Sequence, residues 1–175
     1  MKKFYFLAFA ALLIGGVSYG QTTTSDHYKY GSAIDVAYEV NFPMGNLANG
    51  ASASWAGTTA RYELNLGSGW TGMLTTGYLS FAQQASQQYS AIPLMLGAKL
   101  HFTEGWYGML ETGVHFFSTT GSTQFQNPTE WGVGLGTGYE IPLSKLLSID
   151  LSTKYQYNTD NLSYWNVRAG LMFKL

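Results

Sequence analysis

The last eleven residues of the chain, 165–175, alternate between large apolar side chains and smaller or polar ones. Successive side chains of a β-strand point to opposite sides, so this alternation predicts a strand with one apolar face and one different face. The same period of two recurs from residue 31 onward in segments of about ten residues, which is typical of a transmembrane β-barrel. In the last segment the apolar face would carry Trp165, Val167, Ala169, Leu171, Phe173 and Leu175.

Eight segments with this alternation predict an all-β fold, an eight-stranded antiparallel up-and-down transmembrane β-barrel. The third segment fits either phase, so the sequence does not orient it. Links between segments are long and short by turns, which places the longer links together at the outer end. The predicted strands are 33–42, 54–64, 70–81, 92–102, 106–116, 131–141, 147–157 and 165–175, and the longer links are 43–53, 83–90 and 118–130.

The direction of the apolar face is decided by the residues opposite to it. A soluble lipocalin-like barrel also has eight strands, but its apolar side points inward around a ligand. Here the other face carries Gly132, Gly134, Gly136 and Gly138 in succession, which suits a cramped interior. It also holds most charges, each of which would cost roughly 2 to 4 kcal/mol at the lipid midplane. The predicted inward charges are Asp35, Glu39, Arg61, Glu63, Lys99, Glu111, Glu140, Asp150, Lys154, Arg168 and Lys174.

Aromatic side chains on the apolar face fall near the two ends of the predicted strands. Trp131 and Tyr139 are eight residues apart, as are Trp165 and Phe173. At about 3.3 Å per residue and a tilt near 40°, this spacing spans roughly 20 Å, close to the ~25 Å apolar band of outer-membrane barrels. We therefore predict an aromatic girdle made of Trp106, Phe116, Trp131, Tyr139, Tyr155, Tyr157, Trp165 and Phe173.

The N-terminus has the pattern of an export signal. Lys2 and Lys3 precede the apolar run Phe4–Ile14, and Ser18 and Gly20 follow in a zone of small residues. The apolar run is too short for a membrane-spanning helix, which needs about 20 residues. We expect a removed signal peptide at 1–20, a short lead at 21–30 and the barrel domain at 31–175, located in the outer membrane of a Gram-negative bacterium.

The composition limits the classes of function. Charged residues make up 11% of the chain, whereas a soluble domain has roughly a quarter. Without Lys2 and Lys3, seven basic and ten acidic residues leave a net charge of −3. No basic patch for nucleic acid is expected from this balance. The chain contains no cysteine, so neither disulfides nor thiolate metal sites enter the argument.

Three stretches, NFPMGN, IPLMLGAKLHF and WGVGLGTGYEIPLSKLLSIDLSTKYQY, resemble the small bacterial outer-membrane β-barrel family related to OmpA and OmpX. Their order and spacing carry the resemblance, which spans roughly residues 30 to 175. It implies an eight-stranded barrel in outer-membrane lipid, inserted by the barrel-assembly machinery through its last strand, and we expect a monomer. That strand usually ends in an aromatic residue, whereas here Leu175 is last and Phe173 precedes it by two positions. Pro93 also departs from a regular strand, and we expect it near the outer rim.

The inward charges predict a structural network that fills the lumen, because eight-stranded barrels are just wide enough for side chains. Arg168 is expected to pair with Glu39 or Asp35 where the last strand meets the first. A proton or ion relay through the lumen is the functional alternative. Residues His101, Glu111 and His115 could form a metal or acid–base site, but without a tight spacing motif we favour histidines that fill a polar lumen.

No reaction or cofactor is predicted. Barrel enzymes that deacylate lipid share a His-x-Ser pair, and this chain lacks it. The chain also lacks the Gly-x-Ser-x-Gly motif that presents a serine nucleophile. We expect a structural or surface-interaction protein that contacts an extracellular ligand or surface through its loops. A narrow porin-like channel for small solutes is the alternative, and the sequence favours it only if the four inward glycines leave a continuous water path. A lipocalin-like carrier or an outer-membrane lipid-modifying enzyme comes third.

Overall fold

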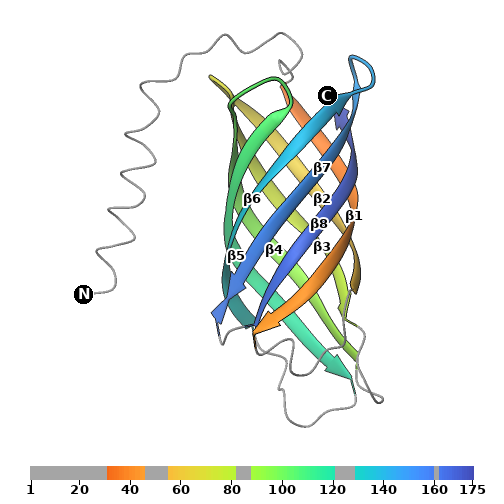
Figure 1. The fold of residues 1–175 in the computed structure, drawn as a ribbon, viewed down its shortest axis with the longest axis vertical. Helices are drawn as coiled ribbons and strands as arrows, with labels where there is room; N and C mark the ends of the chain where they lie inside the picture. Colours follow the sequence, from red (N-terminus) through yellow and green to blue (C-terminus); the bar gives the residue numbers. More distant parts are fainter. Residues whose placement is uncertain (1–30, 46–54, 82–87, 121–128, 160–161) are drawn as a thin grey trace, which may run out of the picture.

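The computed structural model describes residues 31–45, 55–81, 88–120, 129–159 and 162–175, and the predicted signal peptide and lead lie outside these ranges. Eight antiparallel strands pair in chain order and close into a barrel, which confirms the predicted fold class (Figure 1). No helix of the described part is long and apolar enough to cross a membrane. The strands are β1 (Ser32–Gly45), β2 (Trp55–Gly67), β3 (Trp70–Phe81), β4 (Gln88–His101), β5 (Trp106–Thr120), β6 (Thr129–Pro142), β7 (Leu147–Asn158) and β8 (Leu162–Lys174).

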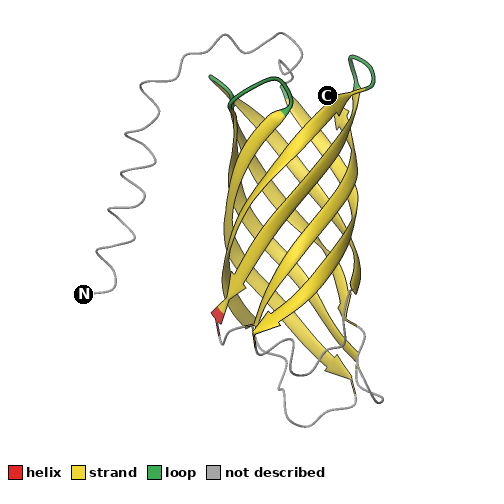
Figure 2. Ribbon diagram, in the orientation of Figure 1, coloured by secondary structure: helices red, strands yellow, loops and turns green. Residues whose placement is uncertain are grey.

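Tight turns join the strands at the end of the barrel where β1 begins and β8 ends (Figure 2). The β2–β3 turn has two central residues, Ser68 and Gly69, with φ of 53° and 81°. Two positive φ values are what a type I′ hairpin turn requires. At the edge of the same end, the Leu175 N–H donates to the Ser32 carbonyl at 2.8 Å, which ties the last residue to the first strand. We call this end the short-turn end.

The strands extend further toward the opposite end, the long-link end, than the side-chain pattern predicts. Pro43–Gly45 belong to β1, Gln88–Ser90 to β4 and Ser118–Thr120 to β5, although we assigned all three segments to links. The links left between the described strands are 46–54, 82–87 and 121–128. The alternation of apolar residues stops where one face no longer meets lipid, whereas the backbone hydrogen bonds between strands continue. Side-chain periodicity therefore underestimates the strand length at this end.

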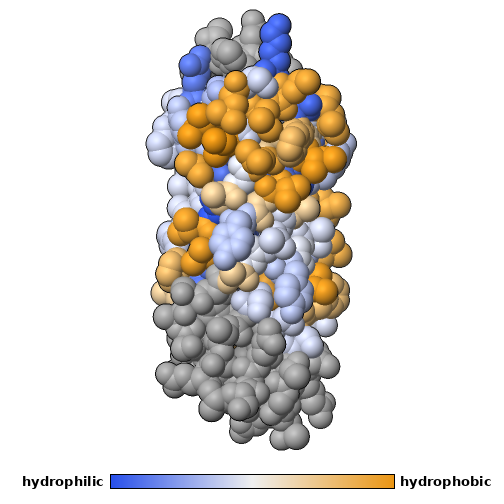
Figure 3. All heavy atoms as spheres, turned by 90° about the vertical axis from the view of Figure 1, so that its right-hand side faces the viewer, coloured by the Kyte–Doolittle hydropathy of each residue, from blue (hydrophilic) through white to orange (hydrophobic). Residues whose placement is uncertain are grey.

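The apolar side chains point outward and the charged ones inward. Leu135 is 67% exposed and Leu171 is 46% exposed, whereas Glu111 and Asp150 are fully buried. This direction contradicts the lipocalin-like alternative, in which the apolar face would line the interior. On the face that Figure 3 shows, the most hydrophobic residues gather toward the short-turn end, with a paler mixed surface below them.

The structure also fixes the phase of β3, which the sequence left open. Thr71, Met73 and Thr75 are buried and face the lumen, whereas Leu74 and Tyr78 are exposed on the outside.

The four inward glycines of β6 do not leave a water path. A Cβ atom at Gly134 would lie 2.8 Å from Cδ of Lys154, and one at Gly136 would lie 2.6 Å from Cε of Met109. Each glycine therefore makes room for a long side chain that lies across it, and the condition for the channel alternative is not met at β6. The side chains over the four glycines come from Tyr107, Met109, Lys154, Gln156 and Asn158.

Pro93 interrupts one ladder of the barrel. It is buried on the inner side of β4, and the pairing between β3 and β4 skips from Thr76↔Leu94 to Leu79↔Ala91. On its other side Pro93 stays in register with His115 of β5. A proline has no N–H to donate, so the gap on the β3 side is the expected consequence. It lies in the half of the barrel toward the long-link end.

Candidate functional site in the barrel lumen

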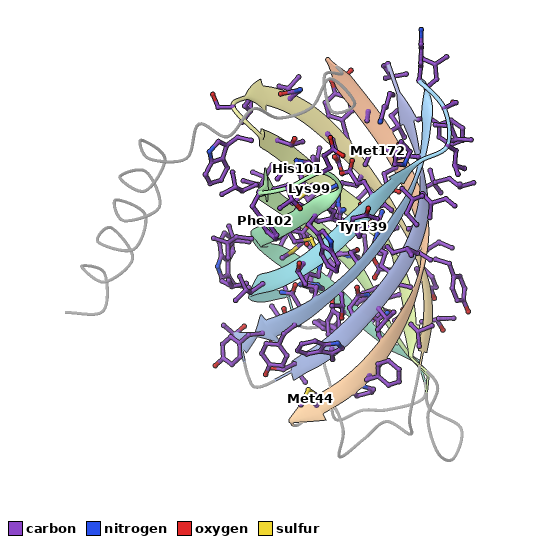
Figure 4. The ribbon with its side chains drawn as sticks, turned by 45° about the horizontal axis from the view of Figure 1, so that its top comes forward. Met44, Lys99, His101, Phe102, Tyr139 and Met172 are labelled. Atoms are coloured by element: carbon purple, nitrogen blue, oxygen red, sulfur yellow. The ribbon has the colours of Figure 1, made fainter. Side chains whose placement is uncertain are left out.

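All eleven predicted inward charges lie inside the barrel, each at most 7% exposed, and ten of them join one ion-pair network. They come from seven of the eight strands, because alternate positions of every strand face the axis. Figure 4 labels two residues of the same face, Lys99 and His101 of β4, and the outward Phe102 that follows them. The ten residues are Asp35, Glu39, Arg61, Glu63, Lys99, Glu111, Glu140, Asp150, Lys154 and Arg168.

Arg168 joins β8 to β1 and β7. Its Nη1 atom lies 2.6 Å from Oδ2 of Asp35 and 2.9 Å from Oδ1 of Asp150. Its Nε atom lies 3.5 Å from Oε1 of Glu39, so Arg168 contacts both carboxylates that the sequence offered as its partners. The third partner, Asp150 of β7, was not anticipated. One guanidinium thus connects the three strands around the point where the barrel closes.

Lys99 forms a second centre on the opposite wall. Its Nζ atom lies 2.5 Å from Glu63, 3.2 Å from Glu140 and 3.3 Å from Asp150. The same ammonium lies 4.3 Å from the ring centroid of Tyr107, and the Tyr107 hydroxyl donates to Asp150 at 2.7 Å. Asp150 is therefore shared between the Arg168 and Lys99 centres. Contacts of this kind cross the lumen and connect strands that do not pair.

A third centre lies around Glu111 of β5. Lys154 Nζ contacts its Oε2 atom at 2.6 Å, and the Thr75 hydroxyl donates to Oε1 at 2.7 Å. Arg61 of β2 lies between this centre and the other two, with nitrogens 3.7 to 3.9 Å from Glu63, Asp35 and Glu111. These longer contacts make Arg61 a bridge that links all three centres into one network.

The energetics of the network favour a structural role. A buried ion pair is weak evidence for net stabilisation, but removal of one partner leaves an uncompensated charge at a cost of about 3–5 kcal/mol. Arg168, Lys99 and Arg61 each contact three carboxylates. Charges shared in this way hold long side chains in one arrangement, which fills the lumen and resists rearrangement.

A group of apolar side chains packs together in the lumen toward the long-link end. His115 lies against this group, with its Nε2 atom 3.0 Å from the Tyr164 hydroxyl oxygen. At the short-turn end, Met172 packs on Ala33. The charged middle is thus bounded on both sides by packed side chains. We call the group near the long-link end the apolar cluster; it consists of Leu79, Ala91, Phe117, Leu162 and Tyr164.

The two histidines and Glu111 do not form one site. His101 Nε2 lies 3.1 Å from Glu140 Oε1, whereas His115 contacts Tyr164. In the β4–β5 register His101 is paired with Tyr107, eight positions along β5 from His115, or about 26 Å at 3.3 Å per residue. Among the described residues, no group of three or more potential ligands is placed to hold a metal ion.

Several lumen residues were missed by the sequence analysis. Glu130 is buried, and its carboxylate accepts a hydrogen bond from the Thr159 hydroxyl. It has the same parity as the inward glycines of β6, so the alternation alone would have placed it inside. Thr59 and Asn166 both donate to Glu39 at 2.7 Å. No local pattern identifies them, because their partner lies on another strand.

The eight residues of the predicted aromatic girdle all face outward. Trp106 and Tyr139 lie at the short-turn end with ring centroids 5.1 Å apart, and Tyr155 and Trp165 lie 6.1 Å apart toward the long-link end. Tyr139 and Tyr155 are half-buried, and the other six are exposed. Placement of the rings at membrane interfaces stays a prediction. The six exposed rings are Trp106, Phe116, Trp131, Tyr157, Trp165 and Phe173.

Comparison of the sequence with models of protein families gives no match, and comparison with curated proteins gives none either. Among solved structures, Ail, the attachment invasion locus protein of Yersinia pestis, superposes with a TM-score of 0.60 at 14% identity, over 82% of this chain and 97% of that chain. Neisserial surface protein A gives a TM-score of 0.57 at 13% identity, with 83% and 97% covered. The outer membrane protein OprG from Pseudomonas aeruginosa gives 0.58 at 11% identity, with 84% and 97% covered. The chain therefore has the fold of these small outer-membrane barrels, as the resemblance implied.

Proposed function

We propose that the chain is an integral outer-membrane protein of a Gram-negative bacterium, with a filled lumen as a rigid scaffold and outer loops that contact a ligand or surface. The observation that carries this proposal is the division of side chains across the barrel wall. Exposed apolar residues cover the outside, and twelve Asp, Glu, Lys and Arg side chains of the described residues are buried inside. Only a surrounding bilayer makes that arrangement favourable, because in water the apolar face would be exposed to solvent and the charged face would be buried.

The filled lumen supports a scaffold in preference to a channel. A continuous charge network occupies the middle, and the apolar cluster lies between that network and the long-link end. We therefore assign no conduction to the barrel at rest. No catalytic activity is proposed.

The longer links give the surface role its location. Links 46–54, 82–87 and 121–128 connect strands at one end and contain no charged residue. One structure of the similar Ail is described as a complex with the heparin analogue sucrose octasulfate. The uncharged links here lack the cations that bind a sulfated ligand. We propose an uncharged polar partner, recognised by amide and hydroxyl side chains.

Export and assembly complete the proposal. A signal peptide at 1–20 would be removed, and a lead at 21–30 would precede the barrel domain at 31–175. The barrel-assembly machinery would insert the monomer into outer-membrane lipid. These steps rest on the sequence pattern and on the resemblance.

One set of measurements tests the proposal. The protein should pellet with outer membranes, migrate differently on a detergent gel before and after boiling, and give no unit currents in liposomes. Recovery in the aqueous phase would contradict the membrane location, and steady unit currents would favour the narrow porin-like channel. Replacement of 121–128 by Asn-Gly should keep the boiling shift but weaken attachment of cells to neutral glycan surfaces, with immobilised heparin as the control surface.

A further inference from the structure

A groove of about 940 Å³ runs along the outside of the barrel, over β4 and β5, from mid-height to the short-turn end. Its floor is low because, at these outward positions, Ala98 carries only a methyl group and Gly108 carries no side chain. A Cβ atom at Gly108 would have only the Phe102 ring in contact, at 3.6 Å, so the floor is open. The walls are apolar and come from four strands. They include Leu66, Trp70, Leu96, Leu100, Phe102 and Leu135.

The shape and the apolar walls of the groove favour a hydrocarbon chain over the other candidate occupants. A second copy of the barrel that met this side by two-fold symmetry would place hollow against hollow and fill neither. The lead at 21–30, which has the sequence QTTTSDHYKY, is too polar for apolar walls. A flexible hydrocarbon chain fills such a hollow without strain. The groove is also continuous with the exposed apolar belt, which the proposed function places in lipid.

The short-turn end indicates which lipid the groove would accept. An up-and-down barrel has its tight turns on the periplasmic side, where the facing leaflet of the outer membrane consists of phospholipid. Ser68 lines the groove, and Glu104 is exposed in the turn between β4 and β5 at the same end of the barrel. A carboxylate favours a headgroup with an ammonium over an anionic one.

We propose that this groove is a binding site for the acyl chain of a phosphatidylethanolamine-type phospholipid from the leaflet at the short-turn end. The site rests on the proposed membrane location, because outside a bilayer the groove would meet only water. Packing contacts between the chain and the walls would retain one lipid through purification in mild detergent.

The test compares two variants with the same chemical change. Ala98→Phe fills the groove, and Ala169→Phe places the same ring on the exposed outer face of β8, across the barrel. Each protein is equilibrated with vesicles of phosphatidylethanolamine and phosphatidylglycerol, extracted, and examined by native mass spectrometry. We expect Ala98→Phe to lower the fraction with bound phosphatidylethanolamine by about fivefold or more, because the ring removes the chain's packing contacts, and Ala169→Phe to leave it unchanged. Gly108→Phe replaces Ala98→Phe if the latter fails to fold.

Equal retention by both variants would overturn the site, and so would bound phosphatidylglycerol in excess over phosphatidylethanolamine. A phosphatidylethanolamine with a photoreactive group in its acyl chain gives a second readout. Crosslinks should concentrate on β4 and β5, whereas an even spread over all strands would contradict the inference. The boiling shift of each variant checks the barrel separately, so failure of the membrane proposal and failure of the lipid site are distinguishable.

Discussion

The charged middle of the lumen and the apolar cluster near its long-link end fill the same cylinder in different ways. In the middle, three cations each contact three carboxylates, and positions are set by charge. In the apolar cluster, Leu79, Phe117 and Tyr164 are positioned mainly by shape, and the Tyr164 hydroxyl contacts His115. Loss of a single ion-pair partner should therefore lower the free energy of unfolding sharply in the charged middle, whereas in the apolar cluster the loss should grow with the side-chain volume removed.

The largest loss is expected from Arg168→Ala. Three carboxylates would lose a buried partner, so the free energy of unfolding should fall by about 3–5 kcal/mol in a urea titration of the folded barrel in lipid. Lys145→Ala in the exposed β6–β7 turn is the control and should change it by less than about 0.5 kcal/mol. Similar effects of the two substitutions would mean that the network does not hold the lumen together.

Phe117→Ala should cost slightly less, about 3 kcal/mol, through the lost apolar contacts and the cavity left in the cluster. This variant should still give no unit currents in liposomes, because the charged middle still occupies the lumen. Unit currents from this single variant would show that the apolar cluster alone closes the barrel, which would break the comparison.

Gly136→Ala should cost about 2 kcal/mol, because the new methyl group meets Met109 and the backbone of β7. The matched control is Gly108→Ala on the outer face, where a Cβ meets only ordinary contact with Phe102. Unfolding midpoints of the two variants in the same lipid separate them. A smaller loss at Gly136 than at Gly108 would contradict the assignment of β6 glycines to side-chain room.

The smallest effect is expected from Thr75→Val, which removes the hydroxyl that donates to Glu111 at 2.7 Å and accepts from Arg61 at 3.4 Å, and it should cost about 1.5 kcal/mol. Thr76→Val, the same change on the outward side of β3, should be neutral or slightly stabilising in lipid. The two urea titrations decide the phase of β3 in the lipid-embedded barrel. The reverse order would place Thr76 in the lumen.

Direction and strand number follow from the sequence because period two and charge separation are local patterns. The phase of β3 does not, since threonine and glycine occur on both of its faces, at Thr71, Gly72, Thr76 and Gly77. Strand ends at Gly45 and Gln88 were missed because backbone pairing outlasts the apolar pattern.

The site divides in the same way. The inward direction of the ten charges can be predicted from their alternate positions along each strand, but their partners cannot. Lys99, for example, contacts Asp150, which lies across the lumen and 51 residues later in the chain. The lipid groove was also out of reach, since it depends on which small outward residues, Ala98 and Gly108, become neighbours when β4 and β5 pair.

A nitroxide scan of β8 tests the central claim most directly, and the absence of native cysteine permits it. Single cysteines at each position from 165 to 174 are labelled, and their collision rates with oxygen are measured in bilayers. The account predicts a period of two, with high oxygen accessibility at Val167, Ala169 and Leu171 and low accessibility at Arg168 and Gly170. Maxima at Arg168 and Gly170, or no alternation along the strand, would contradict it.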